Sequence, residues 1–159
     1  MMTLENYCNT SNEVFNGHPW YGDSLMASLQ NIPLENWNRK PENTSNSIAN
    51  LVCHMIDWRC FVIEKLKENA SFDIELNTSA DWRENIRVHT EEEKNKIVSE
   101  LKDSQEQLMA LIKEKKATWL SNKTPGKEYT NEYMLQGVLQ HDMYHLGQIN
   151  LINNQLKNL

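Results

Sequence analysis

Apolar residues recur at helical spacing in four stretches of the chain, and segments rich in turn-forming residues separate them. The widest apolar stripe begins between Ser45 and Ser47 and ends near Glu68. It contains Ile48, Leu51, Val52, Met55, Ile56, Trp58, Phe61, Val62, Ile63 and Leu66. A stripe this wide is typical of a helix that is covered on several sides, so we expect this helix to be central.

The same spacing predicts three more helices, and each has a residue that can cap its N-terminus. The caps are Asp23 or Ser24 for a helix limited by Pro33, Thr90 (with Glu93 at the third helical position) for the next, and Thr130 for a helix ending near Leu156. Residues 1–15 fit either a short helix or a packed arm. Strand patterns are almost absent, and residues 69–89 form a long irregular connection. We therefore predict an all-α fold, a four-helix bundle with a long crossover connection between its second and third helices.

Composition places the chain among globular proteins. With 159 residues, 39% of them hydrophobic and 24% charged, we expect a single domain over residues 1–159. The net charge of -6 argues against nucleic acid as a partner. No apolar run is long enough for a membrane span, and the polar N-terminus lacks a signal peptide, so the predicted location is cytoplasmic. Three cysteines without a CxxC pair fit reduced thiols.

Three histidines carry the clearest chemical signal. His141 and His145 are four residues apart in the last predicted helix, which places both rings on one side of it. His54 lies on the apolar face of the central helix. Imidazoles directed into a bundle core are costly to bury without partners, and one metal ion would satisfy all three.

Other interpretations of these histidines stay open at this point. Each ring could be a separate core or surface histidine with its own hydrogen-bond partner. A zinc peptidase is disfavoured, because the Glu that follows the first His of such motifs is Asp142 here. Cys53 fits a small buried hydrophobe, and His18 and His89 fit surface or capping positions.

The chain resembles the DinB-like (DinB/YfiT-like) superfamily of metal-binding four-helix bundles. The resemblance covers nearly the whole chain and rests on motifs in their expected order. They are Pro19 to Leu25, Ser47 to Arg59 (which contains His54), the pair Asp81-Trp82, and Gly137 to Ile149 (which contains the two histidines with three residues between them). Two positions depart from the pattern, Asn46 in place of a His and Arg83 in place of a Pro.

This resemblance implies that His54, His141 and His145 bind one divalent metal ion, with zinc expected and nickel as an alternative. It also implies a small-molecule substrate and a homodimer. The apolar width of the central helix, with Trp58 and Phe61, offers a surface for that dimer. We expect a metal-dependent transferase that uses a low-molecular-weight thiol, such as a bacillithiol-type S-transferase. The alternatives are a non-catalytic metal-binding or stress-response module and a metal-dependent hydrolase.

The sequence identifies no catalytic residue. It offers candidates for orienting the ligands, namely Asp142, Tyr144 and Gln148 beside the histidines. It offers others, Trp20, Trp82 and the 69–89 connection, for the mouth of a pocket.

Overall fold

The computed structural model describes residues 3–42 and 44–157, which form five α-helices and no β-strand. The all-α prediction is confirmed. The helices are α1 (Leu4–Asn16), α2 (Leu25–Gln30), α3 (Ile48–Leu66), α4 (Glu91–Lys113) and α5 (Asn131–Lys157), with short 3-10 turns at η1 (Leu34–Asn36) and η2 (Ala117–Ser121).

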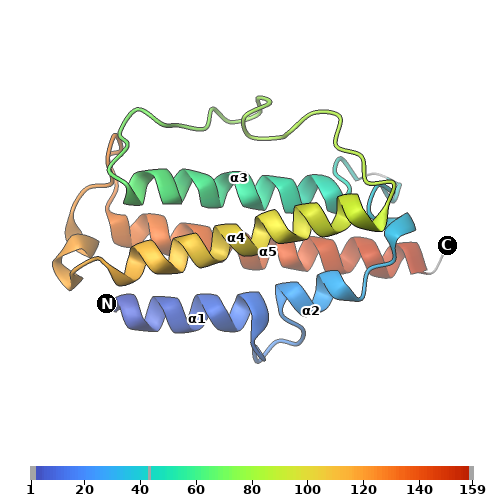
Figure 1. Ribbon diagram of the computed structural model, residues 1–159, viewed down its shortest axis with the longest axis horizontal. Helices are drawn as coiled ribbons and strands as arrows, with labels where there is room; N and C mark the ends of the chain where they lie inside the picture. The colour runs from blue at the N-terminus through green and yellow to red at the C-terminus, as the bar shows by residue number, and fades with distance from the viewer. Residues whose placement is uncertain (1–2, 43, 158–159) are drawn as a thin grey trace.

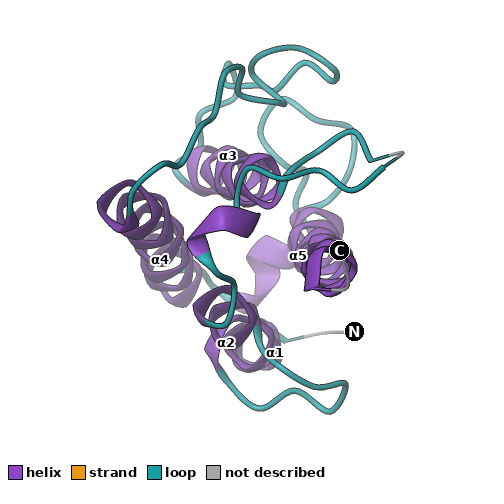
Figure 2. Cartoon of the chain, turned by 90° about the vertical axis from the view of Figure 1, so that its right-hand side faces the viewer, coloured by secondary structure: helices purple, strands orange, loops and turns teal. Residues whose placement is uncertain are grey.

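The three long helices lie side by side, and α1 and α2 follow one another along a further edge of the molecule (Figures 1 and 2). α3 packs against both α4 and α5, and most of its side chains are buried, as its wide apolar stripe predicts. The chain between α3 and α4 returns along the length of α3, so that α4 runs in the same direction as α3 (Figure 1). The molecule is thus organised around α3.

Helix starts follow the predicted caps. Ser47 and Thr90 each form a reciprocal capping box with the residue at the third helical position. The hydroxyls of Ser24 and Thr130 accept hydrogen bonds from Ala27 N and Tyr133 N. At the N-terminus the helix alternative is confirmed from residue 4 onwards, whereas residues 1 and 2 lie outside the described part of the chain.

A buried ion pair joins α3 to α5 in the core. The Arg59 Nη2 atom lies 2.6 Å from Asp142 Oδ2, and Nε lies 3.3 Å from Oδ1. Both side chains are almost fully excluded from solvent, at 1% and 4% exposure. The guanidinium also lies 4.8 Å from the ring centroid of Phe15 in α1. One arginine therefore connects three helices, and its charge depends on Asp142 for compensation.

Side-chain anchors hold the irregular connection between α3 and α4 onto the helices. Arg83 binds Asp57 of α3 and Glu100 of α4, with a 2.7 Å contact to each. The Lys65 ammonium is buried and donates to three backbone carbonyls at the start of the connection. Near its other end, the Asn38 side chain exchanges two hydrogen bonds with the backbone of Val88. These anchors give a segment without helix or strand a defined path.

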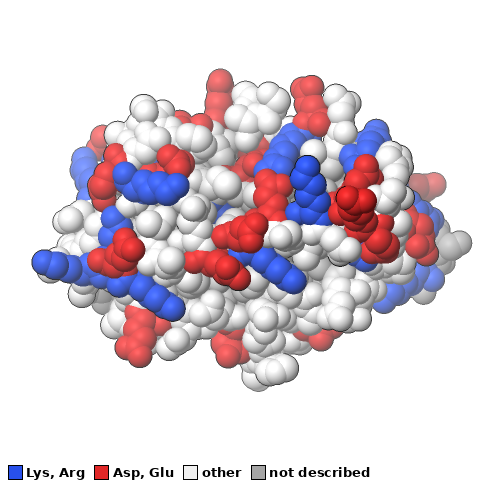
Figure 3. Space-filling model, in the orientation of Figure 1, with Lys and Arg blue, Asp and Glu red and all other residues white. Residues whose placement is uncertain are grey.

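The face seen in Figure 3 carries interspersed acidic and basic side chains, without a continuous basic area. That face offers no extended surface for a phosphate backbone. Among the described helices, none is long and apolar enough to cross a membrane. The cytoplasmic location remains a prediction.

The buried pair gives a first prediction about stability. Arg59→Met should lower the free energy of unfolding by about 3–5 kcal/mol, because it leaves the Asp142 carboxylate buried without a counter-charge. The double variant Arg59→Met/Asp142→Leu should recover most of that loss. Urea unfolding of the three proteins measures both effects, and a double variant as unstable as the single one would contradict this account.

Candidate metal centre

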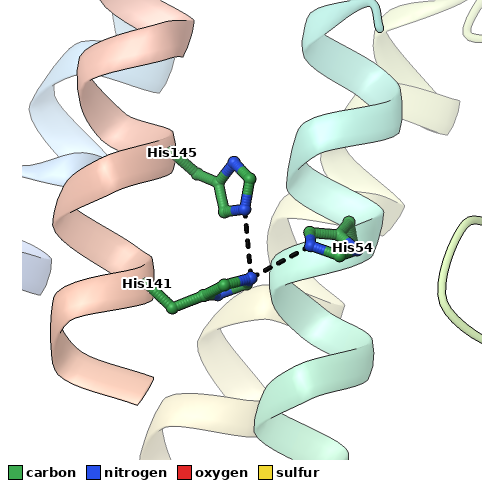
Figure 4. Close-up of side chains that lie close together, drawn as sticks. All are labelled: His54, His141 and His145. Carbon is green, nitrogen blue, oxygen red and sulfur yellow. Dashed lines mark hydrogen bonds between the residues drawn. The ribbon is translucent and has the colours of Figure 1, made fainter. Parts of the chain in front are cut away.

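The side chains of His54, His141 and His145 converge between α3 and α5 (Figure 4). The Nε2 atom of His141 lies 3.0 Å from Nε2 of His54 and 3.0 Å from Nε2 of His145. His54 and His145 are buried and His141 is partly buried. Residues 87 positions apart in the chain thus point the same ring atom toward one place.

Partners on the far side of two rings determine where the protons sit. His54 Nδ1 lies 2.7 Å from the backbone oxygen of Asp81, and His145 Nδ1 lies 2.7 Å from Oε1 of Gln148. A carbonyl oxygen can only accept a hydrogen bond, so each Nδ1 carries the proton. In the neutral rings, each Nε2 then presents a lone pair toward His141.

His141 cannot satisfy both of these lone pairs. As an Nε2–H tautomer it donates to one neighbour and leaves the other without a donor. As an Nδ1–H tautomer it has no acceptor, since its Nδ1 is buried without a partner among the described residues. A proton shared by the rings is also disfavoured. Burial first, and then the neighbouring His145 and His54, lower the pKa of His141 to about 3. Burial likewise lowers the pKa of His145.

Protons alone therefore cannot satisfy the three Nε2 atoms, and no described side chain offers them a shared positive charge. A divalent metal ion meets this requirement, because neutral imidazoles are among its common ligands. Tetrahedral coordination with bonds of about 2.0–2.1 Å places ligand nitrogens about 3.3 Å apart. The two Nε2 separations from His141, 3.0 Å each, are within a few tenths of an ångström of that value, and all three ligand atoms lie within 4.8 Å of one another. The residues present fit a three-histidine metal site.

The connection between α3 and α4 supplies the surroundings of His54. Besides its backbone oxygen, Asp81 uses its carboxylate to accept hydrogen bonds from Trp58 Nε1 at 3.0 Å and from Asn77 N at 2.9 Å. The next residue, Trp82, stacks on the His54 imidazole with ring centroids 3.8 Å apart and planes 3° from parallel. These contacts fix the orientation of the His54 ring, as outer partners of metal ligands commonly do. Sequence reasoning associated Trp82 with the pocket mouth but missed the role of Asp81.

Of the other candidate residues, some contact the histidines and others do not. Gln148 contacts His145 as expected, whereas Asp142 binds Arg59 instead of a histidine. The Tyr144 side chain is exposed, with its ring centroid 5.0 Å from that of His145. Trp20 is fully exposed on the loop after α1, so its side chain shapes no pocket wall. Cys53 is buried, in agreement with its interpretation as a small hydrophobe.

An apolar cavity of about 240 Å³ adjoins the cluster on the side of His141. Trp58 and Val62 of α3 form one wall, and residues from Tyr129 to His141 form the other. A larger hollow of about 620 Å³ lies between the loop after α1 and α4 and contains none of the three histidines. Chemistry at the cluster therefore concerns the smaller cavity.

The orienting contact of Gln148 can be tested directly. Gln148→Ala removes the acceptor of the His145 Nδ1 proton, so metal affinity should fall by about 10–100-fold, the usual effect of losing an outer partner. Competition with a chelating dye measures this affinity. Gln140→Ala, an exposed glutamine on the same helix, serves as the control and should bind as the unmodified chain does. Equal affinity of the two variants would contradict the orienting role.

Comparison with known proteins adds a family relationship. The family model described as the DinB superfamily matches residues 22–149, a range that includes all three histidines. Neither the comparison with curated proteins nor that with solved structures gives a match.

Proposed function

Since the chain belongs to the DinB superfamily, we propose that it is a metal-dependent transferase that joins a low-molecular-weight thiol to an electrophilic small molecule. In this proposal the fold is a four-helix bundle in which α1 and α2 share the fourth position, and the α3–α4 connection is its crossover. His54, His141 and His145 hold one divalent ion. Zinc is the expected ion, and nickel suits the same ligands.

The observation that carries this proposal is the convergence of three imidazole Nε2 atoms on one place. With all three rings neutral, only the Nε2 atom of His141 can carry a proton there. Three protein ligands leave a coordination position for another molecule, which is typical of catalytic and not of structural sites. A bound divalent ion supplies Lewis-acid chemistry, which favours the thiolate form of a thiol.

The protein's own residues orient the metal-ligating rings and cover them. Asp81 and Gln148 fix the rings of His54 and His145, while Trp82 and Trp58 shield them from water. In the reaction, sulfur forms a bond to the electrophilic carbon and the leaving group departs with its bonding electrons. The thiol proton is released to solvent, so the reaction needs no oxidant or reductant.

A metal-dependent hydrolase is less well supported, because it needs a general base near the reacting water. The two carboxylates closest to the histidines in sequence or contact are already engaged. Asp142 pairs with Arg59, and Asp81 accepts from Trp58 and Asn77. The second alternative is a non-catalytic module with a structural metal. Its folding stability should depend on the metal, so metal removal tests it.

The proposal is tested with zinc-loaded protein, a panel of thiols (bacillithiol, coenzyme A, glutathione and cysteine) and the electrophile monochlorobimane. We expect conjugation with at least one thiol, and we expect His145→Ala to lose the activity together with the metal. Metal analysis of untagged protein and of His141→Ala/His145→Ala provides the control. Stoichiometric metal in the double variant would disprove the site. Conjugation no faster than without protein, for every thiol, would disprove the transferase. Unfolding upon metal removal would then favour the structural module.

The proposal includes a homodimer, which the family resemblance implies. Phe61 is buried inside the chain, and Trp58 is partly buried and binds Asp81, so this part of α3 is not a free surface. The outer face of α5 is better suited. Its exposed side chains include Met143, Tyr144 and Leu151, and charged residues are absent between Asp142 and Lys157. Loss of charge with enrichment in Tyr and Met is typical of interface cores.

A substitution on α5 tests this interface. Leu151→Asp places a charge in the centre of the uncharged face, so it should shift the protein from dimer to monomer. Gel filtration with light scattering at micromolar concentrations measures the mass. Leu76→Asp, which changes an exposed leucine of the α3–α4 connection, should remain dimeric. A monomer mass for the unmodified chain would refute the dimer.

A further inference from the structure

The cavity beside His141 is lined by apolar and aromatic side chains, although it adjoins the three histidines. Its lining comprises the rings of Trp58, Tyr129 and Tyr133, the side chains of Val62 and Val138, and other uncharged groups. No Lys, Arg, Asp or Glu is among the described residues that line it. His141 belongs to both the lining and the histidine cluster, and its ring centroid lies 5.9 Å from that of Trp58. Trp58 in turn lies edge-on to the His54 ring, with centroids 6.3 Å apart.

These walls contain few polar atoms, and one of them already has a hydrogen-bond partner. The Trp58 indole N–H donates to Asp81, which leaves its ring face as the contact surface. Because no Lys, Arg, Asp or Glu is among the described residues that line the cavity, a charged ligand group would lose water there without gaining a counter-charge from the walls, which is costly.

The volume of the cavity further limits which ligand groups fit in it. A cavity of about 150 Å³ is sufficient for benzene in an apolar protein core. The volume of about 240 Å³ here leaves room for a substituted benzene ring or a short branched alkyl chain. Gly137 lies at the exposed mouth of the cavity on the α5 side, where a Cβ atom built at this position meets no heavy atom within 4 Å. Glycine in a helix interior costs about 1 kcal/mol relative to alanine, so this gap is made at some expense in stability.

We infer that this cavity binds an uncharged aromatic or branched alkyl group of the substrate, next to the position that His141 faces. The inference rests on the proposed function in one respect, because it assigns this group to the electrophile and not to the thiol. The carboxylates of a thiol such as glutathione find no cationic partner in these walls. The substrate class is thus a neutral, hydrophobic electrophile.

Two probes with the same ring test the binding preference on zinc-loaded protein. Benzyl alcohol is neutral, and benzylammonium carries a charge. Two-dimensional NMR titrations should show benzyl alcohol shifting the Trp58 indole N–H signal and the amides of residues 133–138. Benzylammonium should bind at least about tenfold more weakly because its charge is not compensated. Shifts confined to other parts of the chain, or equal binding of the two probes, would overturn the inference.

Substitution at one glycine provides a matched pair of variants. Gly137→Phe should fill the cavity and weaken benzyl alcohol binding at least about tenfold, whereas Gly137→Ala should change it less than about threefold. Both replacements favour the helix over glycine, so both proteins should fold and retain zinc. Binding by Gly137→Phe as tight as by Gly137→Ala would overturn the inference. If Gly137→Phe does not fold, the NMR titration of the unmodified chain decides.

The binding tests need no turnover, so they separate this inference from the proposed function. Absence of thiol conjugation together with cavity binding would refute the transferase and leave the subsite intact. Conjugation of monochlorobimane that continues in Gly137→Phe, with unchanged dependence on its concentration, would refute the subsite and leave the transferase intact.

Discussion

The convergence of three histidine Nε2 atoms at one buried place is the constraint on which the site depends. Two of the three histidines have a partner on their other side, Asp81 or Gln148, and these bonds direct their remaining lone pairs at the third ring. A protein core offers no water to solvate such lone pairs, and burial opposes protonation. A cation that binds several nitrogen lone pairs at once would complete the cluster. Proton counting and proximity thus both support a metal ion here.

The long connection between α3 and α4 is part of this arrangement. Because α3 and α4 run in the same direction, the chain must return along the molecule (Figure 1). On the way its Asp81 backbone oxygen lies 2.7 Å from His54 Nδ1. That path places Asp81 and Trp82 against the His54 ring, while Arg83 ties the segment to both helices. Anchors on either side of the site keep the orienting groups in place without regular secondary structure. The connection is therefore structural support for the site as well as a link between helices.

Much of the fold and the histidine cluster could be predicted from local signals. Helix starts at Ser47 and Thr90 depend on residues within one turn, and the facing of His141 and His145 depends only on helical period. The role of Asp81 could not be predicted in this way, because it arises from contacts 23 to 27 residues away along an irregular segment. The Arg59–Asp142 pair spans 83 residues, and nothing local distinguishes Asp142 from a residue of the metal site. Likewise α1 carries a polar serine in the middle of its buried stripe, which weakens the helical pattern there.

The register of α5 explains how one helix serves several roles. Gly137, His141, His145 and Gln148 follow steps of four, four and three residues, so they form one stripe along the helix. Along that stripe come a cavity-lining glycine, two rings of the histidine cluster and the acceptor that orients one of them. Asp142 is one residue, or about 100°, further around the helix, which directs its carboxylate to Arg59 in the core instead. A single inserted residue within this stretch would rotate the cavity away from the ligands or Asp142 away from Arg59. The spacing of these residues on α5 thus couples the stability of the core to the geometry of the site.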